Sequence, residues 1–221
     1  MDSLRGALAA LVTGLAATLL ILALAVIPFL GPVWVDFAQH RALAGEWTGF
    51  TPEQLATVTG EILADLVLGP PDFDVTLDGA PVLTENERGH MRDVRGVFAG
   101  FFLVAGIAAA GLAILFLAAR GREARTRFWG RLERTGIVIV VVTLVGGVMG
   151  MLLFDQAFIL FHEIFFPGGN YLFDPRTDRL VQLFPQQFWV DSTIGVGMVV
   201  IGLSILLALG SRRRRTRLVA R

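Results

Sequence analysis

Four stretches of the chain carry no charged residue and are mostly apolar: 6–30, 96–119, 135–154 and 192–211. About 20 helical residues cross a hydrocarbon core of roughly 30 Å, and each stretch is at least that long. The pattern therefore predicts four transmembrane helices. The alternative, four buried helices in a soluble core, needs more covering chain than 221 residues supply.

The predicted fold is an all-α membrane protein. We expect a single integral membrane domain over residues 1–221, with outer loops at 32–95 and 155–191. A small-residue segment at 42–44 resembles a signal-peptide cleavage site. However, the first apolar run is longer than the core of a signal peptide, which has about 7–15 residues, so we expect it to be retained as a helix.

The charges are distributed unevenly between the two sides that these spans define. Thirteen arginines and three carboxylates belong to the termini and the short 120–134 segment, whereas six arginines and sixteen carboxylates belong to the outer loops. The sides therefore sum to +10 and −10. Because arginine-rich loops stay inside, we expect both termini to be cytoplasmic and the outer loops to face out of a bacterial inner membrane.

The first outer loop contains several element signals. Thr51-Pro52 is typical of a helix start, and apolar residues at three- to four-residue spacing extend this helix to about Leu68. Alternation over 73–77 before Asp78-Gly79 indicates a hairpin. Because no breaker follows the capping residue Thr84, we expect one continuous helix over 85–118.

The second outer loop begins with more helical pattern. Asp155, Phe158 and His162 follow the third span at helical spacing, so we expect them to share a face of its extension. A turn is expected around 167–170, and residues 178–188 predict a short amphipathic helix interrupted at Pro185. Phe and Trp are dense here, which is typical of a segment at headgroup depth.

The amino-acid composition excludes several classes of functional site. The chain has no cysteine and no lysine, which excludes thiolate metal sites, disulfides and a cysteine acyl-enzyme. The net charge is zero, and nothing favours nucleic-acid binding. Ser192 is the one serine expected near the outer surface, and no nucleophile elbow surrounds it.

Two histidines are placed for acid/base work. His90 precedes the second span by six residues and His162 follows the third by eight, so at about 1.5 Å per residue both lie at similar depth on neighbouring helices. Asp93 is a candidate partner for His90, and Asp155 or Glu163 for His162. A metal site with His90, Asp93, His162 and Glu163 as ligands is the competing interpretation, although no dense ligand motif is present. His40 is expected to be solvated.

Two segments resemble a family of bacterial integral membrane proteins that includes the lipoprotein intramolecular transacylase. The resemblance rests on a His-x-x-Asp-Val motif, on a Phe-His-x-x-Phe-Phe motif and on the segments that follow, at 90–95, 161–167, 173–175, 178–180 and 183–189. The four-span layout is similar as well, so the resemblance covers nearly the whole chain.

The resemblance implies a membrane acyltransferase. Such an enzyme moves the sn-2 acyl chain of a diacylglyceryl-modified N-terminal cysteine to the α-amine of that residue, which yields a lyso-form lipoprotein. The substrate brings its own nucleophile, so no serine, cysteine or cofactor is required. It implies that His90 and His162 form the catalytic pair. In this hypothesis Asp93 orients His90, while the roles of acid and base stay open.

Four further residues are candidates for substrate binding. Arg92 and Arg95 have the charge to bind an oxyanion or a lipid headgroup, or to anchor the helix at the interface, and Glu163 and Asp155 suit a cationic amine. The predicted partner is a diacylglyceryl-modified lipoprotein or a membrane lipid. The alternatives are a non-enzymatic lipid-binding or scaffold protein and a metal-dependent lipid hydrolase.

Overall fold

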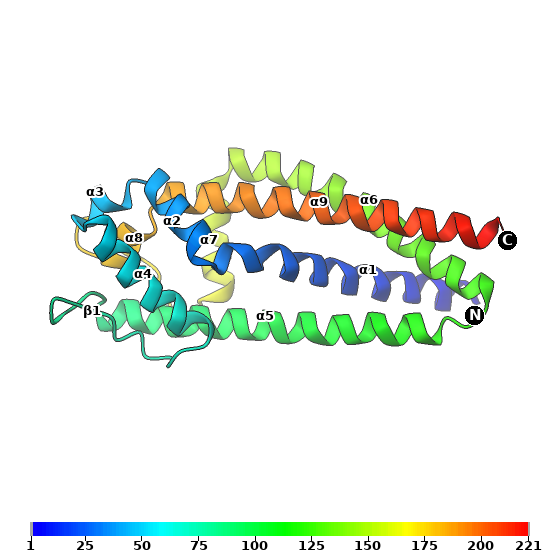
Figure 1. Cartoon of the computed structure of the whole chain (residues 1–221), viewed down its shortest axis with the longest axis horizontal. Helices are drawn as coiled ribbons and strands as arrows, with labels where there is room; N and C mark the ends of the chain where they lie inside the picture. The colour runs from blue at the N-terminus through cyan, green and yellow to red at the C-terminus, as the bar shows by residue number, and fades with distance from the viewer. Residues whose placement is uncertain (1, 221) are drawn as a thin grey trace. The chain divides into compact units, whose positions relative to one another are not determined.

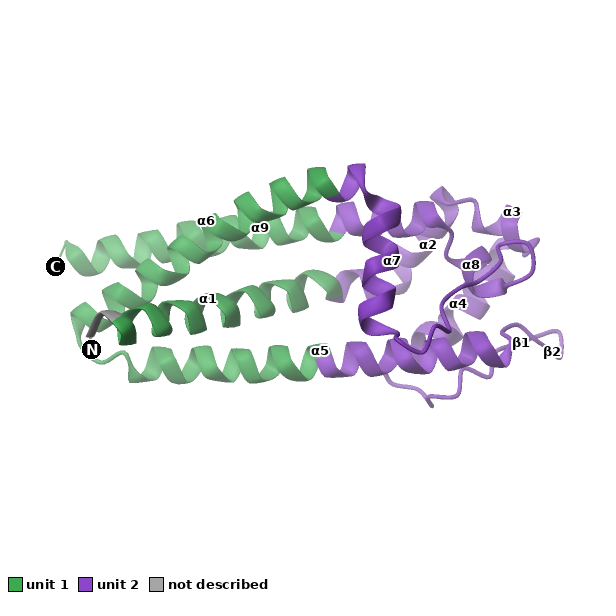
Figure 2. Ribbon diagram, turned by 180° about the vertical axis from the view of Figure 1, so that it is seen from behind, with its two compact units in different colours: residues 1–26, 101–149, 196–221 green, residues 27–100, 150–195 purple. Residues whose placement is uncertain are grey.

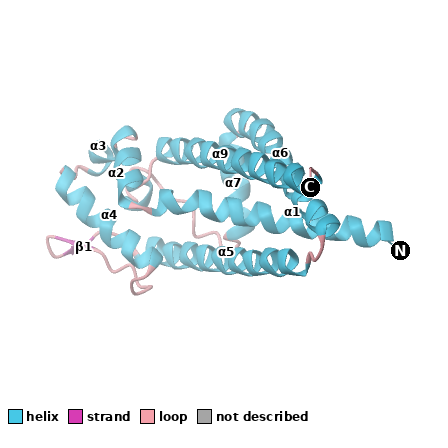
Figure 3. Ribbon diagram, turned by 45° about the vertical axis from the view of Figure 1, so that its right-hand side comes forward, coloured by secondary structure: helices cyan, strands magenta, loops and turns pink. Residues whose placement is uncertain are grey.

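The computed structural model describes residues 2–220, and helices dominate it (Figures 1 and 3). The only regular strands in this part of the chain form a two-residue antiparallel ladder. The elements in chain order are α1 (Asp2–Val26), η1 (Ile27–Leu30), α2 (Pro32–Arg41), α3 (Ala44–Thr48), α4 (Pro52–Val67), β1 (Thr76–Leu77), β2 (Ala80–Pro81), α5 (Glu85–Ala118), α6 (Arg122–Leu152), α7 (Phe154–Phe165), α8 (Arg179–Leu183) and α9 (Gln186–Val219).

The prediction of an all-α protein with four membrane-spanning helices is confirmed. Within the described residues, the helical segments long and apolar enough to cross a membrane are Leu4–Leu30, Glu85–Ala118, Arg122–Leu152 and Gln186–Val219. Each contains nearly all of one charge-free stretch and extends beyond it at one or both ends. The helix expected over 85–118 forms without interruption as α5.

The chain packs into two compact units (Figure 2). Unit 1 comprises residues 1–26, 101–149 and 196–221, and unit 2 comprises residues 27–100 and 150–195. The helices α5, α6 and α9 contribute residues to both units. The expectation of a single membrane domain stays a prediction.

Unit 1 consists of helical segments that run side by side (Figure 2). One cluster of its buried residues comes from α1, α6 and α9 and includes Ile21, Ile139 and Val200. The contact between α6 and α9 is close, because a Cβ added at Gly136 would lie 2.6 Å from the carbonyl oxygen of Ser204. Small residues let helix backbones approach in this way inside a membrane, where packing rather than the hydrophobic effect holds helices together.

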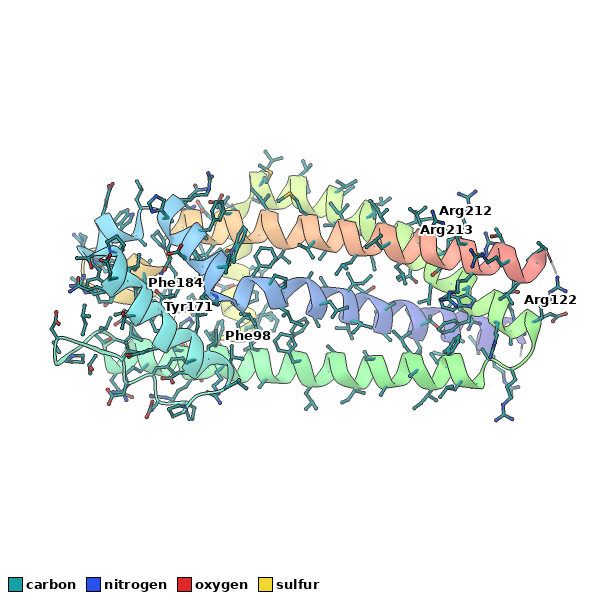
Figure 4. The ribbon with its side chains drawn as sticks, in the orientation of Figure 1. Phe98, Arg122, Tyr171, Phe184, Arg212 and Arg213 are labelled. Carbon is teal, nitrogen blue, oxygen red and sulfur yellow. The ribbon has the colours of Figure 1, made fainter. Side chains whose placement is uncertain are left out.

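The arginines of unit 1 gather at one end of its helices, where α1 begins, α9 ends and the α5–α6 connection lies (Figure 4). Arg122 donates to the carbonyl oxygens of Leu218 and Val219, which closes the last turn of α9. The guanidinium of Arg215 pairs with Glu133, with 2.8 Å between Nε and Oε2. The segments predicted to share one side of the membrane therefore share one end of this unit.

Unit 2 is built on the helix α4, whose predicted start is confirmed. Thr51 and Gln54 form a reciprocal capping box: the hydroxyl of Thr51 accepts from the Gln54 backbone, and the Gln54 side chain accepts from the Thr51 backbone. Its buried face packs against the hairpin, the first turns of α5 and α8. This cluster contains Val58, Ile62, Phe73, Val75, Val82, Leu83, Met91, Leu180 and Leu183.

The predicted hairpin also forms, with the turn at Asp78-Gly79. Both turn residues have positive φ, 53° and 79°, which favours glycine and is tolerated by aspartate. The paired strands are only two residues long, β1 with β2. Val75 and Val82 flank the ladder and are buried, so the hairpin contributes to the core through its ends.

Three parts of unit 2 differ from the sequence-based expectation. Residues 32–48, expected as loop, form α2 and α3. The helix expected to extend the third span instead breaks at Leu153, whose φ and ψ of −126° and 33° are not helical, and α7 is a separate helix. In the amphipathic helix expected over 178–188, the interruption expected at Pro185 is observed, but only the part before it, α8, is a short helix, because the residues from Gln186 onward belong to α9.

Candidate active site

His90 and His162 face each other within unit 2. Their ring centroids are 6.0 Å apart and the ring planes are inclined by only 20°. His90 comes from the second turn of α5 and His162 from α7. Both are buried, with 6% and 9% of the residue surface exposed. The expected proximity of the two imidazoles is thus observed, although α7 is not the straight extension on which that expectation was based.

Glu87 anchors the part of α5 that carries His90. The side chain of Glu87 is fully buried and lies one turn before His90. Its Oε2 accepts from the backbone N–H and the hydroxyl of Thr84, at 2.7 and 2.8 Å. Its Oε1 accepts from the backbone N–H of Leu180 at 2.6 Å. Glu87 therefore caps α5 and ties it to the first turn of α8.

His162 is oriented by its own helix. Its Nδ1 lies 2.7 Å from the carbonyl oxygen of Phe158, one turn earlier in α7. Because a carbonyl oxygen only accepts, Nδ1 carries the proton in this hydrogen bond. In the neutral ring the lone pair is then on Nε2. The ring of Phe158 also packs on His162, with a centroid distance of 4.1 Å.

Aromatic side chains surround the two histidines. The ring of Phe166 contacts both, at centroid distances of 4.7 Å from His90 and 5.5 Å from His162. Phe173 lies 5.5 Å from His90, and Tyr171 lies 5.1 Å from His162. The segment after α7 therefore covers both imidazoles with apolar surface. Figure 4 shows Tyr171 and Phe184 within this unit.

Asn170 connects this segment to α5. Its Nδ2 donates to Oδ2 of Asp93 at 2.7 Å, and its side chain interacts with His90. Nδ1 of His90 and Oδ1 of Asn170 are both buried and have no hydrogen-bond partner of good geometry among the described residues. Asp93 itself is exposed and acts on His90 through its charge. Asp93 was predicted to be the partner of His90; in the structure Asn170 interacts with both of these side chains.

Asp174 stabilises the end of the segment between α7 and α8. Arg176 donates to both side-chain oxygens of Asp174, the residue after Phe173, at 2.6 to 3.2 Å. These hydrogen bonds hold the pKa of the Asp174 carboxyl below its ordinary value. The backbone N–H of Asp174 donates to Asp178, which fixes the turn that leads into α8.

The other predicted site residues differ in their surroundings. Arg92 pairs with the exposed carboxylate of Glu85 at 2.6 Å. Arg95 donates to the carbonyl oxygens of Asp65 and Gly69 and so closes the end of α4. Asp155 accepts from Gln186 at 2.7 Å. Glu163 is exposed. Substrate binding by these four residues stays a prediction.

Two residues considered at the margin of the site lie apart from the histidine pair. The hydroxyl of Ser192 accepts from the indole N–H of Trp34 at 3.0 Å, and His40 is exposed on α2. Within residues 2–220 no three His, Asp or Glu side chains gather in a way that could hold a metal ion.

Sequence analysis missed Asn170 and the role of Glu87. The spacing of Thr84 and Glu87 is that of a capping box, which was a readable signal for the helix start. The bond from Glu87 to Leu180 spans 93 positions and has no local signature. The same is true of Asn170, whose partner Asp93 is 77 positions away.

Comparison with known proteins identifies relatives of this arrangement. The model of the family "Lipoprotein intramolecular transacylase Lit" matches residues 10–189. An uncharacterized protein of Aquifex aeolicus (strain VF5) is 28% identical over 134 residues. That match covers 59% of this chain and 56% of the relative, so it spans little more than half of the relative's length.

Solved structures show the same fold. The in meso structure of the membrane-integral transacylase Lit from Bacillus cereus superposes with a TM-score of 0.70 at 18% identity and covers 97% of both chains. A second structure of that protein, with one histidine substituted, gives a TM-score of 0.65 at 18% identity and covers 99% of this chain and 94% of the other.

Proposed function

The chain belongs to the lipoprotein intramolecular transacylase Lit family, and on this basis we propose that it is a membrane acyltransferase. Its substrate in this proposal is a lipoprotein whose N-terminal cysteine carries a diacylglyceryl group. The sn-2 acyl chain moves to the α-amine of the same residue. The observation that carries the proposal is the pair of buried imidazoles, 6.0 Å apart under an aromatic cover.

The reaction needs three proton transfers, because the nitrogen loses two protons and the glyceryl oxygen gains one, and two histidines can supply them. The ammonium first loses a proton, and the amine nitrogen then attacks the ester carbonyl and forms a tetrahedral intermediate. A C–N bond forms and the nitrogen loses its second proton, while the C–O bond to the glyceryl oxygen breaks and that oxygen takes up a proton. The net products are an amide, a glyceryl hydroxyl and one released proton. Holding amine and ester together contributes much of the acceleration.

The hydrogen bond of His162 supports its assignment as the base. Because Nδ1 donates to Phe158, the lone pair on Nε2 is free to accept a proton from the attacking amine. His90, having taken the first proton from the ammonium, then donates it to the departing glyceryl oxygen. Two imidazolium rings at this separation would repel each other, so an exchange in which one ring gains as the other loses keeps a single charge on the pair.

The aromatic cover favours transfer to an amine over hydrolysis. Phe166 is 4% exposed and contacts both histidines. Apolar surface next to the reacting ester leaves little room for a competing water molecule. Asp93 and Asn170 orient His90 in this proposal. We further propose that the site faces out of the bacterial inner membrane, with both termini in the cytoplasm, because the arginine-rich end of unit 1 is expected inside.

Mass spectrometry of a reporter lipoprotein tests the proposal. The reporter is co-expressed with the full chain in a host that lacks N-acylation, and its N-terminal peptide is analysed. We expect wild type to yield an N-acyl, S-monoacylglyceryl peptide. His90→Gln and His162→Gln should each reduce its formation by at least about a hundredfold, the scale of acid/base contributions.

His40→Gln provides the matched control, because His40 is an exposed histidine of the same unit. It should leave the product unchanged. An unchanged diacylglyceryl peptide in the presence of well-expressed, membrane-inserted wild type would contradict the acyl transfer. Full product formation by either histidine variant would contradict the catalytic pair.

A further inference from the structure

The arginine-rich end of unit 1 contains a cavity that the proposed reaction does not use. It has a volume of about 230 Å³ and lies where α5 ends and α6 begins. Leu115, Ala119 and Phe128 give it an apolar lining, and Phe128 is buried. Arg127 and Arg131 line it as well. An apolar cavity with two guanidinium groups suits a ligand that is itself part apolar and part anionic.

The two arginines are placed to act together. They are four residues apart on α6, so their side chains lie on one face of the helix. Arg131 has no hydrogen-bond or ion-pair partner among residues 2–220. Arg127 pairs with Glu123 at 3.3 Å, but both side chains are largely exposed, and such a pair contributes little. Both guanidinium groups can therefore bind an incoming anion.

Neighbouring arginines are engaged differently. The guanidinium of Arg125 lies over the ring of Phe116 at 5.6 Å, and that of Arg214 lies over Trp129 at 5.6 Å. The rings of Phe116, Phe128 and Trp129 contact one another, with centroids 5.5 to 5.8 Å apart. Of these three rings, Phe128 lines the cavity, and the other two pack behind it. Trp and Arg together are typical of the depth at which lipid headgroups lie.

The outer surface of α5 beside the cavity is apolar. Ile114 and Leu117 are 66% and 72% exposed in the protein, and they belong to a helix long and apolar enough to cross the membrane. Such side chains contact lipid acyl chains. A phosphate group bound at Arg127 and Arg131 would thus be continuous with an acyl-chain surface, which a free phosphate ion would not use.

We propose that this cavity binds the headgroup phosphate of an anionic phospholipid, with Arg127 and Arg131 as its ligands. Guanidinium groups bind phosphate oxygens through paired, charge-assisted hydrogen bonds. Basic pockets between transmembrane helices are known to hold anionic headgroups. The site is independent of the histidine pair and of acyl transfer.

Native mass spectrometry of the full chain tests the site. The protein is released from nanodiscs that contain phosphatidylglycerol and phosphatidylcholine in equal amounts, and the retained lipid is identified. Wild type should retain one phosphatidylglycerol. The R127Q/R131Q variant should retain at least about tenfold less, since two charge-assisted contacts are lost. R127K/R131K keeps the charges without the paired geometry and should fall between them.

R213Q/R217Q is the matched control, because Arg213 and Arg217 are an exposed arginine pair at the same spacing on α9. It should retain phosphatidylglycerol as wild type does. Equal loss in both double variants would overturn the proposal in favour of general charge attraction, and no loss in R127Q/R131Q would overturn it outright. Equal retention of phosphatidylcholine would overturn the preference for anionic lipid.

A thermal-shift measurement separates the two sources of phosphate. Phosphatidylglycerol should raise the unfolding temperature of wild type but not of R127Q/R131Q, whereas inorganic phosphate at the same concentration should have no effect. Equal stabilisation by inorganic phosphate would overturn the lipid assignment. An unfolding temperature of lipid-free R127Q/R131Q equal to that of wild type establishes that the substitutions do not unfold the chain.

Discussion

The first turns of α5 and the helix α7 each carry one histidine of the site, but the two regions are stabilised in different ways. Around His90 lie the fully buried Glu87, with three accepted hydrogen bonds, and Met91, which belongs to the largest core cluster of unit 2. In α7, by contrast, His162 is the one buried residue.

The exposed residues of α7 are apolar rather than polar. Ile159, Leu160, Phe161, Ile164 and Phe165 are between 46% and 63% exposed. A helix with so much exposed apolar surface is stable only against a non-aqueous neighbour, and a lipid interface provides one. From this difference we expect His90 to be positioned by the protein core and the position of His162 to depend also on the lipid that contacts α7.

Among the tests of this contrast between α5 and α7, Glu87→Gln is expected to have the largest effect. The substitution replaces one accepting oxygen with an NH2 group that would face N–H or O–H donors, and it leaves a buried polar group unsatisfied. We expect a loss of about 1–3 kcal/mol in unfolding free energy. Because α5 then loses its tie to Leu180, we also expect reduced acyl transfer. Thermal unfolding and the reporter assay measure the two effects.

Glu85→Gln is the control for that substitution. Glu85 lies two residues earlier on the same helix, and its side chain is exposed and pairs with Arg88 and Arg92. It should leave both stability and activity unchanged. If Glu87→Gln unfolded at the temperature of wild type, the core could not be what positions His90.

The second test addresses α7 through its exposed face. Leu160 and Ile164 lie one turn apart and are each more than half exposed, so the double substitution to Asn acts mainly on the exposed face of the helix. If lipid holds the helix, the variant loses about 1–2 kcal/mol of interfacial binding. We expect acyl transfer to fall by about tenfold and the amides of α7 to exchange faster by a similar factor.

Glu163→Gln controls for a change on the same helix, because Glu163 is exposed and polar. In this variant the backbone amides of α7 should exchange hydrogen at the wild-type rate. The amides around His90 should keep their protection in both variants. If the α7 amides of the double Asn variant exchanged at wild-type rates, lipid contact would not be what stabilises α7, and the contrast with α5 would be wrong.

The third test concerns Asn170, which links the two regions. Asn170→Ala and Asp93→Ala each remove the hydrogen bond that Asn170 donates to Asp93 and release the orientation of His90. Each should lower kcat by about tenfold, or about 1.4 kcal/mol, with KM unchanged. Because both act through one contact, the double variant should be no slower than either single one. Additive losses would mean that the two residues act separately.

The smallest effect is expected for Arg92→Gln. The Arg92 guanidinium is at the surface, where its ion pair with Glu85 contributes little, so the unfolding temperature should not change. Arg95→Gln is the informative comparison, since Arg95 satisfies two carbonyl oxygens at the end of α4. It should lower the unfolding temperature. A rise in KM with Arg92→Gln alone would indicate that Arg92 binds substrate.

The sequence predicts well what depends on local patterns. The four spans follow from runs of uncharged residues, and the start of α4 follows from Thr51-Pro52. The break at Leu153 has no such signature, because no proline or glycine occupies that position and the helical spacing continues through Phe158 to His162. A periodicity argument cannot distinguish one long apolar helix from two.

In the candidate site, too, the features that depend on local sequence could be predicted, and those that depend on long-range contacts could not. The two histidines could be paired from their depth along the helices, since depth depends on residue counts. Their supporting groups could not, because Glu87 and Asn170 reach partners that are distant in sequence. The α2 and α3 helices were missed because polar residues interrupt their apolar pattern.

The close approach at Gly136 has a consequence for mutational tolerance. An added methyl group there would overlap the backbone of Ser204 and the side chain of Ala208, at 2.6 and 3.0 Å. At Gly146 and Gly147, ten residues further along the same helix, it would meet nothing within 4 Å. In a saturation library of α6, Gly136 should therefore tolerate no substitution, whereas Gly146 and Gly147 should accept other residues, so the tolerance profile alone would locate the close contact between α6 and α9.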